Sequence, residues 1–225
     1  ANPPYMSSSN MNAELANYVK AKYPEGKADL FAVFMYVAMD ILKKDGKMGM
    51  INMQSWMFLS SFETLRNTFL TKYHIDNMLH LGPHTFDELG GEVVQNTAFV
   101  FSNGISNADG QYFRLIDFTP SSLKESYYLN ILNSILCYED LMTAGVNLSP
   151  YYYHVSQTYF DSIPGGILGY WVTTNIHETF TQNLPLSAVA SPCVGLQTAD
   201  NGRFLRSWFE VSIDNIGLNY KNAAL

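Results

Sequence analysis

The sequence has few of the features that mark secreted or membrane-spanning proteins. Only two cysteines, Cys137 and Cys193, occur in 225 residues. They are too few for a disulfide framework and too far apart for a ligand pair, so we expect a reducing, cytoplasmic setting. The longest apolar run, residues 30–39, has 10 residues, whereas a membrane-spanning helix needs about 20. The N-terminus also lacks the basic start and apolar stretch of a signal peptide.

Positive charge is scarce as well. There are 13 Lys and Arg residues against 20 Asp and Glu, a formal net charge of -7. This balance excludes a generally basic surface that coats nucleic acid, so any contact with phosphate must be local. Hydrophobic residues make up 47% of the chain and charged residues 15%, which is typical of a folded globular protein and not of a disordered one.

Hydrophobic periodicity predicts an alternation of helices and strands, and therefore an α/β fold. The predicted helices are 11–22, 30–44, 61–72, 121–137 and 168–180, and the predicted strands are 49–53, 75–81, 93–101, 112–118 and 151–155, with strand-like pieces around Val194 and Phe209. Turn residues separate 93–101 from 112–118, so we expect these two strands to form an antiparallel hairpin.

The tetrapeptide Asn2-Pro3-Pro4-Tyr5 is the feature that carries chemistry. An amino group on an aromatic ring is a poor nucleophile because its lone pair is delocalised into the ring. Hydrogen bonds from both N–H groups to the Asn2 amide oxygen and the Pro3 carbonyl would localise that lone pair, and the two prolines would hold the loop extended. The ring of Tyr5 would offer a flat face for stacking a planar base.

The tetrapeptide and four downstream blocks resemble the N6-adenine DNA methyltransferases of the PglX type in BREX phage defence and the type IIG restriction-modification enzymes. The blocks are residues 86–88, 91–101, 163–171 and 194–206. They are spread over nearly the whole chain and are far more specific than the tetrapeptide alone.

The resemblance implies the carboxyl-terminal half of a Rossmann-like class I methyltransferase sheet with a terminal β-hairpin, followed by the start of a target-recognition region. Residues 1–120 would belong to the catalytic domain, 121–150 would form a helical connector, and 151–225 would open the target-recognition region. In that family a glycine-rich cofactor loop precedes the tetrapeptide, and here only Ala1 precedes it. We therefore expect a piece of a larger enzyme that is inactive alone.

The resemblance also implies a cofactor, a partner and roles for individual residues. S-adenosylmethionine would be the cofactor of the parent enzyme, and double-stranded DNA with a flipped adenine its partner. Carried over to this sequence, the catalytic candidates are Asn2, Pro3, Pro4 and Tyr5, the candidates for a second stacking wall are Phe86 and Phe99, with Phe86 preferred, and the DNA-binding candidates are Gln197, Thr198, Arg203 and Arg206.

Several alternatives stay open. The chain could be a non-catalytic module that binds protein or DNA, or a methyltransferase acting on a protein glutamine. Arg203 and Arg206 could instead pair with Glu210 on one helix face. His80 and His84 have the spacing of a metal pair on a helix, but Gly82-Pro83 would break that helix. We therefore expect no metal site.

Overall fold

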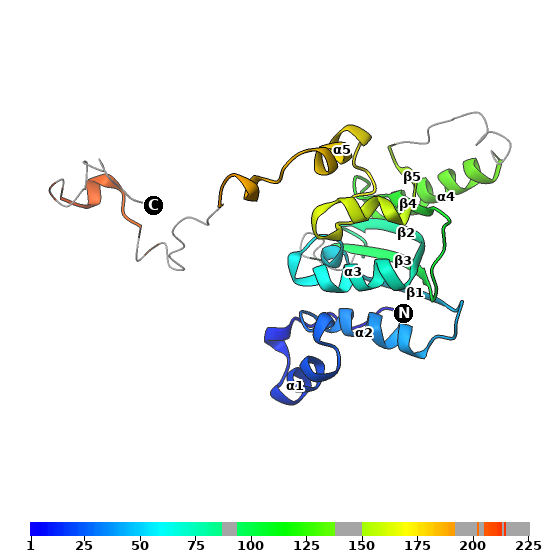
Figure 1. Cartoon of the computed structure of the whole chain (residues 1–225), viewed down its shortest axis with the longest axis horizontal. Helices are drawn as coiled ribbons and strands as arrows, with labels where there is room; N and C mark the ends of the chain where they lie inside the picture. The colour runs from blue at the N-terminus through cyan, green and yellow to red at the C-terminus, as the bar shows by residue number, and fades with distance from the viewer. Residues whose placement is uncertain (87–93, 138–149, 192–201, 203–204, 213, 215–225) are drawn as a thin grey trace. The chain divides into compact units, whose positions relative to one another are not determined.

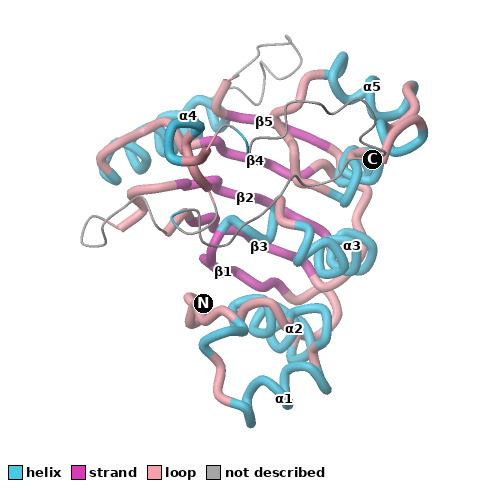
Figure 2. Tube along the Cα trace, turned by 90° about the vertical axis from the view of Figure 1, so that its left-hand side faces the viewer, coloured by secondary structure: helices cyan, strands magenta, loops and turns pink. Residues whose placement is uncertain are grey.

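The computed structural model describes residues 1–86, 94–137, 150–191, 202, 205–212 and 214. The chain divides into two compact units, Ala1–Asn183 and Leu184–Leu225. The first unit contains a five-stranded sheet in the order β1-β3-β2-β4-β5 (Figure 2). The strands are β1 (Lys47–Met53), β2 (His74–Gly82), β3 (Asn96–Ser102), β4 (Gly110–Arg114) and β5 (Tyr152–Val155).

The sheet is mixed, and its pairing defines the edge that matters for function. β2 and β4 pair in parallel, whereas β3 is antiparallel to both β1 and β2 and β5 is antiparallel to β4. β1, β2 and β4 therefore run in the same direction. They end together at Met53, Gly82 and Arg114, and we call this side the carboxyl edge.

The predicted hairpin between 93–101 and 112–118 is wrong. β3 lies between β1 and β2, so both of its edges are already occupied. β4 pairs instead with β2 and β5. The turn residues between the two strands do reverse the chain, but a turn signal does not say which edge of a sheet the next strand will join. The α/β class is confirmed, in the form of a five-stranded mixed sheet.

The described residues contain five α-helices, the predicted number; α4 has the predicted bounds, and the other four are shorter than predicted. They are α1 (Ala13–Lys22), α2 (Leu30–Ile41), α3 (Glu63–Lys72), α4 (Ser121–Cys137) and α5 (Thr174–Gln182) (Figure 1). The Asn12 side chain accepts from the Leu15 N–H and the Asp29 side chain from the Phe31 N–H, so both helices are capped. The predicted helix start at residue 168 is wrong, because α5 begins at Thr174, and Leu168 is buried in the core ahead of it.

Apolar side chains pack on both faces of the sheet because successive strand residues point to opposite sides. Met50 and Phe99 face a core shared with α2 and α3. On the other face, Phe113 packs in a smaller cluster with side chains of α4, and Leu79 joins it from β2. The sheet of the first unit is therefore a central layer with helices on both faces.

The sheet continues past the predicted connector. β5 comes from residues that were assigned to the target-recognition region, yet it is the edge strand beside β4. The functional division at residues 120 and 150 stays a prediction. In the second unit, the strand expected around Phe209 is wrong, because Trp208–Glu210 is a 3-10 helix, and Val194 lies outside the described residues. None of the described helices is long and apolar enough to cross a membrane.

Candidate functional site

The loop Asn2–Tyr5 lies at the carboxyl edge, next to β1. The Ala1 nitrogen donates to the Gly49 carbonyl at 2.7 Å, and the Ile51 N–H donates to the Ala1 carbonyl at 2.9 Å. This is the hydrogen-bond pattern of a parallel strand pair, so the chain enters the loop in the same direction as β1. Open α/β sheets bind ligands beyond the carboxyl ends of their strands, and the loop occupies that position.

Side-chain hydrogen bonds connect the loop to the sheet. The Tyr5 hydroxyl donates to Asn2 Oδ1 at 3.2 Å and accepts from Asn96 Nδ2 at 3.0 Å. Asn96 also donates to the Asn52 carbonyl at 3.3 Å. Asn2 and Pro4 are exposed, Pro3 is buried and Tyr5 is half-buried. The loop is thus held by its tyrosine while its asparagine remains open to solvent.

Tyr5 is also fixed through its ring and its protonation state. Its ring lies edge-on to Phe31, with the ring centres 6.2 Å apart and an interplanar angle of 86°. Burial raises the pKa of Tyr5, and the hydrogen bond from Asn96 opposes that rise. The hydroxyl therefore keeps its proton at neutral pH, and this proton is what it donates to Asn2.

The exit of the loop is tied to the start of α2. The Met6 N–H donates to Asp29 Oδ1 at 3.0 Å, and the Leu30 N–H donates to the Met6 carbonyl at 2.9 Å. Burial raises the pKa of Asp29, whereas hydrogen bonds from backbone N–H groups lower it. Asp29 therefore anchors the loop and caps the helix with one carboxylate.

Two buried amide oxygens lie beside the loop without a donor. Asn52 and Asn96 are fully buried, and neither Oδ1 has a hydrogen-bond partner among the described residues. Buried polar atoms are nearly always paired, with protein, water or a ligand. These two oxygens therefore offer unused acceptor capacity next to Tyr5.

A second polar chain runs along the same edge. His80 Nδ1 lies 2.9 Å from the Tyr170 hydroxyl, and His80 Nε2 lies 2.7 Å from Gln54 Oε1. Gln54 Nε2 in turn donates to Gln95 Oε1. Burial is the main cause that lowers the pKa of His80 to about 4, with the charge of Arg114 adding to it. The imidazole is therefore neutral at physiological pH.

The candidate stacking and DNA-binding residues predicted from the sequence differ in their position and burial in the structure. Phe99 is 2% exposed and packs against Trp56 and Phe101 in the core, whereas Phe86 is 37% exposed just after β2. Gln197, Thr198 and Arg203 lie outside the described residues. Arg206 donates to the carbonyls of Gly202 and Leu205. Phe86 thus remains the candidate for a second stacking wall.

The structure also gives the partners of Glu210, which was considered as an ion-pair partner of Arg203 and Arg206, and the positions of His80 and His84, which were considered as a metal pair. The Glu210 carboxylate accepts from the Ser207 N–H. His80 belongs to the polar chain, and His84 follows β2 with a positive φ of 54°. The described part of the chain contains no group of three or more His, Cys, Asp or Glu side chains placed to hold a metal ion.

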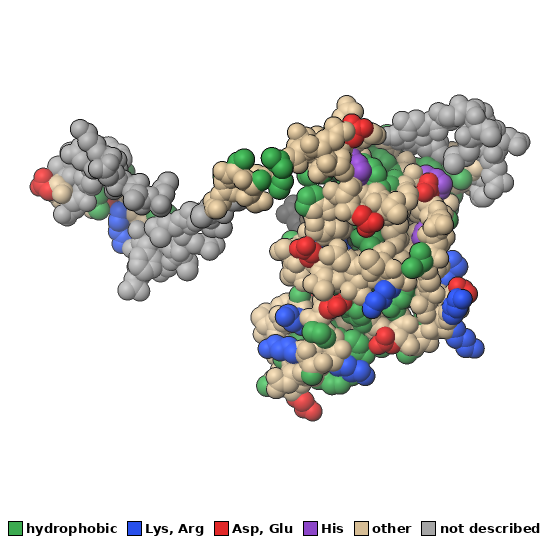
Figure 3. All heavy atoms as spheres, viewed as in Figure 1, with side chains coloured by type: hydrophobic (Ala, Val, Ile, Leu, Met, Phe, Trp, Pro, Cys, Tyr) green, Lys and Arg blue, Asp and Glu red, His purple; other side chains and the backbone are tan. Residues whose placement is uncertain are grey.

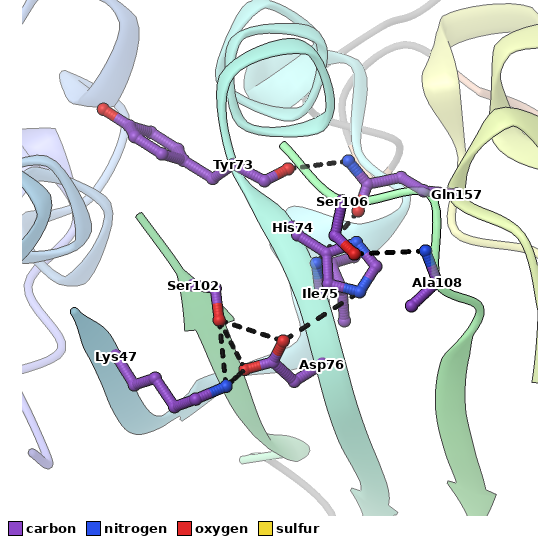
Figure 4. A network of polar contacts seen from close by, with 9 residues as sticks. All are labelled: Lys47, Tyr73, His74, Ile75, Asp76, Ser102, Ser106, Ala108 and Gln157. Atoms are coloured by element: carbon purple, nitrogen blue, oxygen red, sulfur yellow. Dashed lines mark hydrogen bonds and ion pairs between the residues drawn. The ribbon is translucent and has the colours of Figure 1, made fainter. Parts of the chain in front are cut away.

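The side of the sheet opposite the carboxyl edge, where β1 and β2 begin, carries another polar network (Figure 4). Lys47 Nζ pairs with Asp76 Oδ2 at 2.5 Å, and the Ser102 hydroxyl donates to the same carboxylate. Here the Lys47 ammonium is paired with a carboxylate of the protein itself, and the network ties β1, β3 and β2 together. We read it as structural.

Sequence reasoning missed the residues that connect the site. Asn96, Gln54 and Tyr170 meet the loop or His80 from segments 26 to 91 residues away. The one available signal is the pair Gln95-Asn96, two amides at the start of a strand that is otherwise apolar. Without the strand order, that signal does not reveal their partners.

Comparisons with known proteins find relatives of this chain among adenine-specific methyltransferases. Residues 1–86 match the family described as Eco57I restriction-modification methylase. The chain is 39% identical over 217 residues to the adenine-specific methyltransferase PglX of Lacticaseibacillus casei (strain Zhang), and the match covers 96% of this chain and 17% of that protein. It is 40% identical over 223 residues to the adenine-specific methyltransferase BrxX of Escherichia coli O9:H4 (strain HS), covering 96% and 16%. The chain thus spans about a sixth of the length of these relatives.

Two solved structures share the fold. One is a chain of a type I R-M system, with TM-score 0.54 and 16% identity over 84% of this chain and 39% of that chain. The other is the type IIG restriction endonuclease BpuSI, with TM-score 0.52 and 13% identity over 81% and 22%. At these identities the likeness concerns the fold alone.

Proposed function

We propose that this chain, which is homologous to the adenine-specific methyltransferases PglX and BrxX, supplies the edge of a DNA methyltransferase site that grips the amino group of adenine. The observation that carries the proposal is the placement of Asn2–Tyr5. This loop leaves the carboxyl edge with Asn2 exposed and Tyr5 bonded to the sheet through Asn96.

The acceptors of the loop suit an exocyclic amine. Asn2 Oδ1 and the Pro3 carbonyl would each accept one N–H of the adenine N6 group, and this would localise the nitrogen lone pair for attack on a methyl group. The bond from Tyr5 to Asn2 Oδ1, 3.2 Å long, holds that amide with its oxygen fixed and uses only one of its acceptor positions. The loop itself then supplies preorganisation, and no general base is required of it.

The stacking role falls to Tyr5, with Phe86 as the opposing wall. A base flipped from the duplex must be held by its faces as well as by its hydrogen-bonding edge. Tyr5 is half-buried and pinned at its hydroxyl, so its ring is oriented before a base arrives. Phe86 is 37% exposed and follows β2, which ends at the same edge.

Methylation of adenine in this family implies S-adenosylmethionine as the methyl donor, and the described residues do not form a cradle for it. Among the described residues, two of the four glycines with positive φ, Gly82 and Gly166, are closely packed. A Cβ on Gly82 would lie 2.8 Å from the Ile116 side chain, and one on Gly166 would lie 2.7 Å from Asn67. No residue of this chain is therefore assigned to the cofactor.

Surface charge suits a site that contacts DNA locally. Acidic and basic side chains are interspersed on the face shown in Figure 3, without a broad basic area. With a net charge of -7, this chain would gain little from nonspecific attraction to phosphate. Recognition of the base itself would then account for most of the affinity that this chain contributes.

The test compares adenine with purine, which lacks the N6 amine, at one position of a short single-stranded oligonucleotide. Fluorescence anisotropy should show that the chain binds the adenine oligonucleotide several-fold more tightly, because two hydrogen bonds are lost with the amine. Asn2→Ala should remove this preference, and Asn107→Ala, a change of an exposed asparagine in the β3–β4 connection, should keep it. Equal binding of adenine and purine by the unmodified chain would contradict the proposal.

A further inference from the structure

A patch of amides and aromatic rings lies on the carboxyl edge beside the Asn2–Tyr5 loop. We call it the amide–aromatic patch, and its members are Gln54, Phe58, Gln95 and Trp171. Gln54 directly follows β1 and Gln95 directly precedes β3. The Gln54 N–H donates to the Gln95 carbonyl at 2.8 Å, so the two segments are joined through their backbones as well as their side chains.

The rings of the patch are held in place and remain partly open. The Phe58 and Trp171 ring centres are 5.8 Å apart in an edge-to-face arrangement. Each ring also contacts His80, at 5.9 and 5.8 Å. Phe58 and Trp171 are half-buried, whereas His80 is 4% exposed. A buried imidazole therefore supports two rings that still present surface to solvent.

The polar chain behind the rings has a fixed direction. The Tyr170 hydroxyl is buried, and its only acceptor among the described residues is His80 Nδ1. Because a buried hydroxyl hydrogen needs an acceptor, Tyr170 donates to Nδ1, and His80 then carries its proton on Nε2. That proton goes to Gln54 Oε1, and Gln54 Nε2 donates to Gln95 Oε1.

The donor-to-acceptor order of this hydrogen-bond chain leaves amide N–H donors without an acceptor at the surface. One N–H of Gln54 and the whole NH₂ group of Gln95 have no acceptor among the described residues, and Gln95 is exposed. The chain thus orients amide donors beside two aromatic faces. A flat molecule with hydrogen-bond acceptors on its edge matches both features, and a nucleobase is such a molecule.

Charge favours a base over a phosphate at this place. The pKa of His80 is lowered to about 4, so the imidazole adds no positive charge at neutral pH. Arg114, whose charge acts on His80, is already paired with Asp117 at 2.5 Å. The donors of the patch are therefore neutral amides, which suit the ring nitrogens and carbonyl oxygens of a base.

The patch also adjoins the adenine-gripping loop. Gln95 and Asn96 are consecutive, with Cα atoms about 3.8 Å apart. The Asn96 side chain holds Tyr5, and the Gln95 side chain belongs to the patch. The loop and the patch therefore meet the carboxyl edge at consecutive residues of the chain, and this is where a base next to one at Tyr5 would lie.

We propose that the amide–aromatic patch is a second nucleobase site, which stacks the base next to the target adenine and reads its acceptor edge through Gln95 and Gln54. The inference rests on the proposed function, since it takes the target base at the Asn2–Tyr5 loop as its reference. If the inference holds, this part of the enzyme recognises the base next to the target adenine as well as the adenine itself.

The test uses the whole chain and short single-stranded oligonucleotides with one adenine, whose neighbouring nucleotide either carries a base or is abasic. Fluorescence anisotropy should show at least tenfold weaker binding of the abasic oligonucleotide, as expected for the loss of a stacked base. Gln95→Glu keeps the acceptor oxygen for Gln54 but removes the donors, and it should shrink this difference. Gln182→Ala, which changes an exposed glutamine on α5, should leave the difference intact.

Trp171 provides an independent readout. Stacking of a neighbouring base should quench tryptophan emission, and Trp171→Phe should remove that quenching while Trp56 and Trp208 remain. Equal binding of the abasic oligonucleotide would overturn the inference. An equal weakening of both oligonucleotides by Gln95→Glu would also overturn it, because the effect of Gln95 would then not depend on the neighbouring base.

The two proposals fail separately in these measurements. A preference for adenine over purine without any effect of the neighbouring base would remove the second site alone. Loss of the preference for the adenine amine would remove the proposed function, whatever the neighbouring base does.

Discussion

Asn96 donates a hydrogen bond of 3.0 Å to the hydroxyl of Tyr5, which lies 91 residues earlier in the chain. This contact joins the first residue of β3 to the loop that we propose grips adenine. Because Tyr5 in turn donates to Asn2, the position of the Asn2 amide depends on a side chain of the sheet. The placement of β3 next to β1 therefore helps to determine where the Asn2 amide lies.

We predict energetic coupling between Asn96 and Tyr5. Tyr5→Phe should lower the free energy of unfolding by about 1 kcal/mol, because a partly buried hydrogen bond is lost. In the Asn96→Ala background the same change should cost much less. A double-mutant cycle measured by urea unfolding checks this. Strictly additive effects would show that the contact contributes nothing to stability.

We predict a pH dependence of stability that comes from His80. Its pKa is lowered to about 4 in the folded chain, against an ordinary value of about 6.5 in the unfolded chain. Stability is therefore full above pH 6.5 and falls as the pH drops toward 4, because the unfolded state takes up a proton first. The loss attributable to His80 is about 3 kcal/mol over that window.

The control for this pH dependence is His80→Gln, which keeps an acceptor for Tyr170 and a donor for Gln54 without a titrating group. Urea unfolding of both proteins at pH 7.5 and pH 5 gives the comparison. The unmodified protein should lose more stability than the variant between these two values. The same loss in both proteins would rule out His80 as the cause.

We predict that Arg66 is a major contributor to the stability of the first unit. It is 1% exposed, and its guanidinium donates to the carbonyls of Trp56, Leu59 and Gly165. Arg66→Leu would leave these carbonyls without their donor, at a cost of about 3 kcal/mol. Lys44→Leu, a change of an exposed cation, should shift the urea midpoint little. A similar small shift for Arg66→Leu would contradict this role.

Local structure was predictable because it depends on neighbouring residues. The apolar spacing in 30–42 indicates a helix, and the structure contains α2 (Leu30–Ile41) there. The candidate loop Asn2–Tyr5 was recognisable because the chemistry proposed for it needs only four consecutive residues. Each of these patterns lies within a short stretch of chain.

The strand order and the supports of the site were not predictable in the same way. The short run of turn residues after β3 gave no sign that β2 would separate β3 from β4. The preference for Phe86 over Phe99 rested on the strand predicted at 93–101, and the exposed fractions of 37% and 2% come from the packing of the sheet. Contacts such as Asn96 to Tyr5 depend on strand pairing between distant segments.

The most direct test of the account replaces Asn2 by alanine in the chromosomal gene and maps N6-methyladenine across the genome by single-molecule sequencing. If the parent protein methylates adenine as proposed, N6-methyladenine at one DNA sequence motif should disappear in the Asn2→Ala strain, and Asn107→Ala should leave it in place. Methylation that persists in the Asn2→Ala strain would show that the loop does not hold the adenine amine.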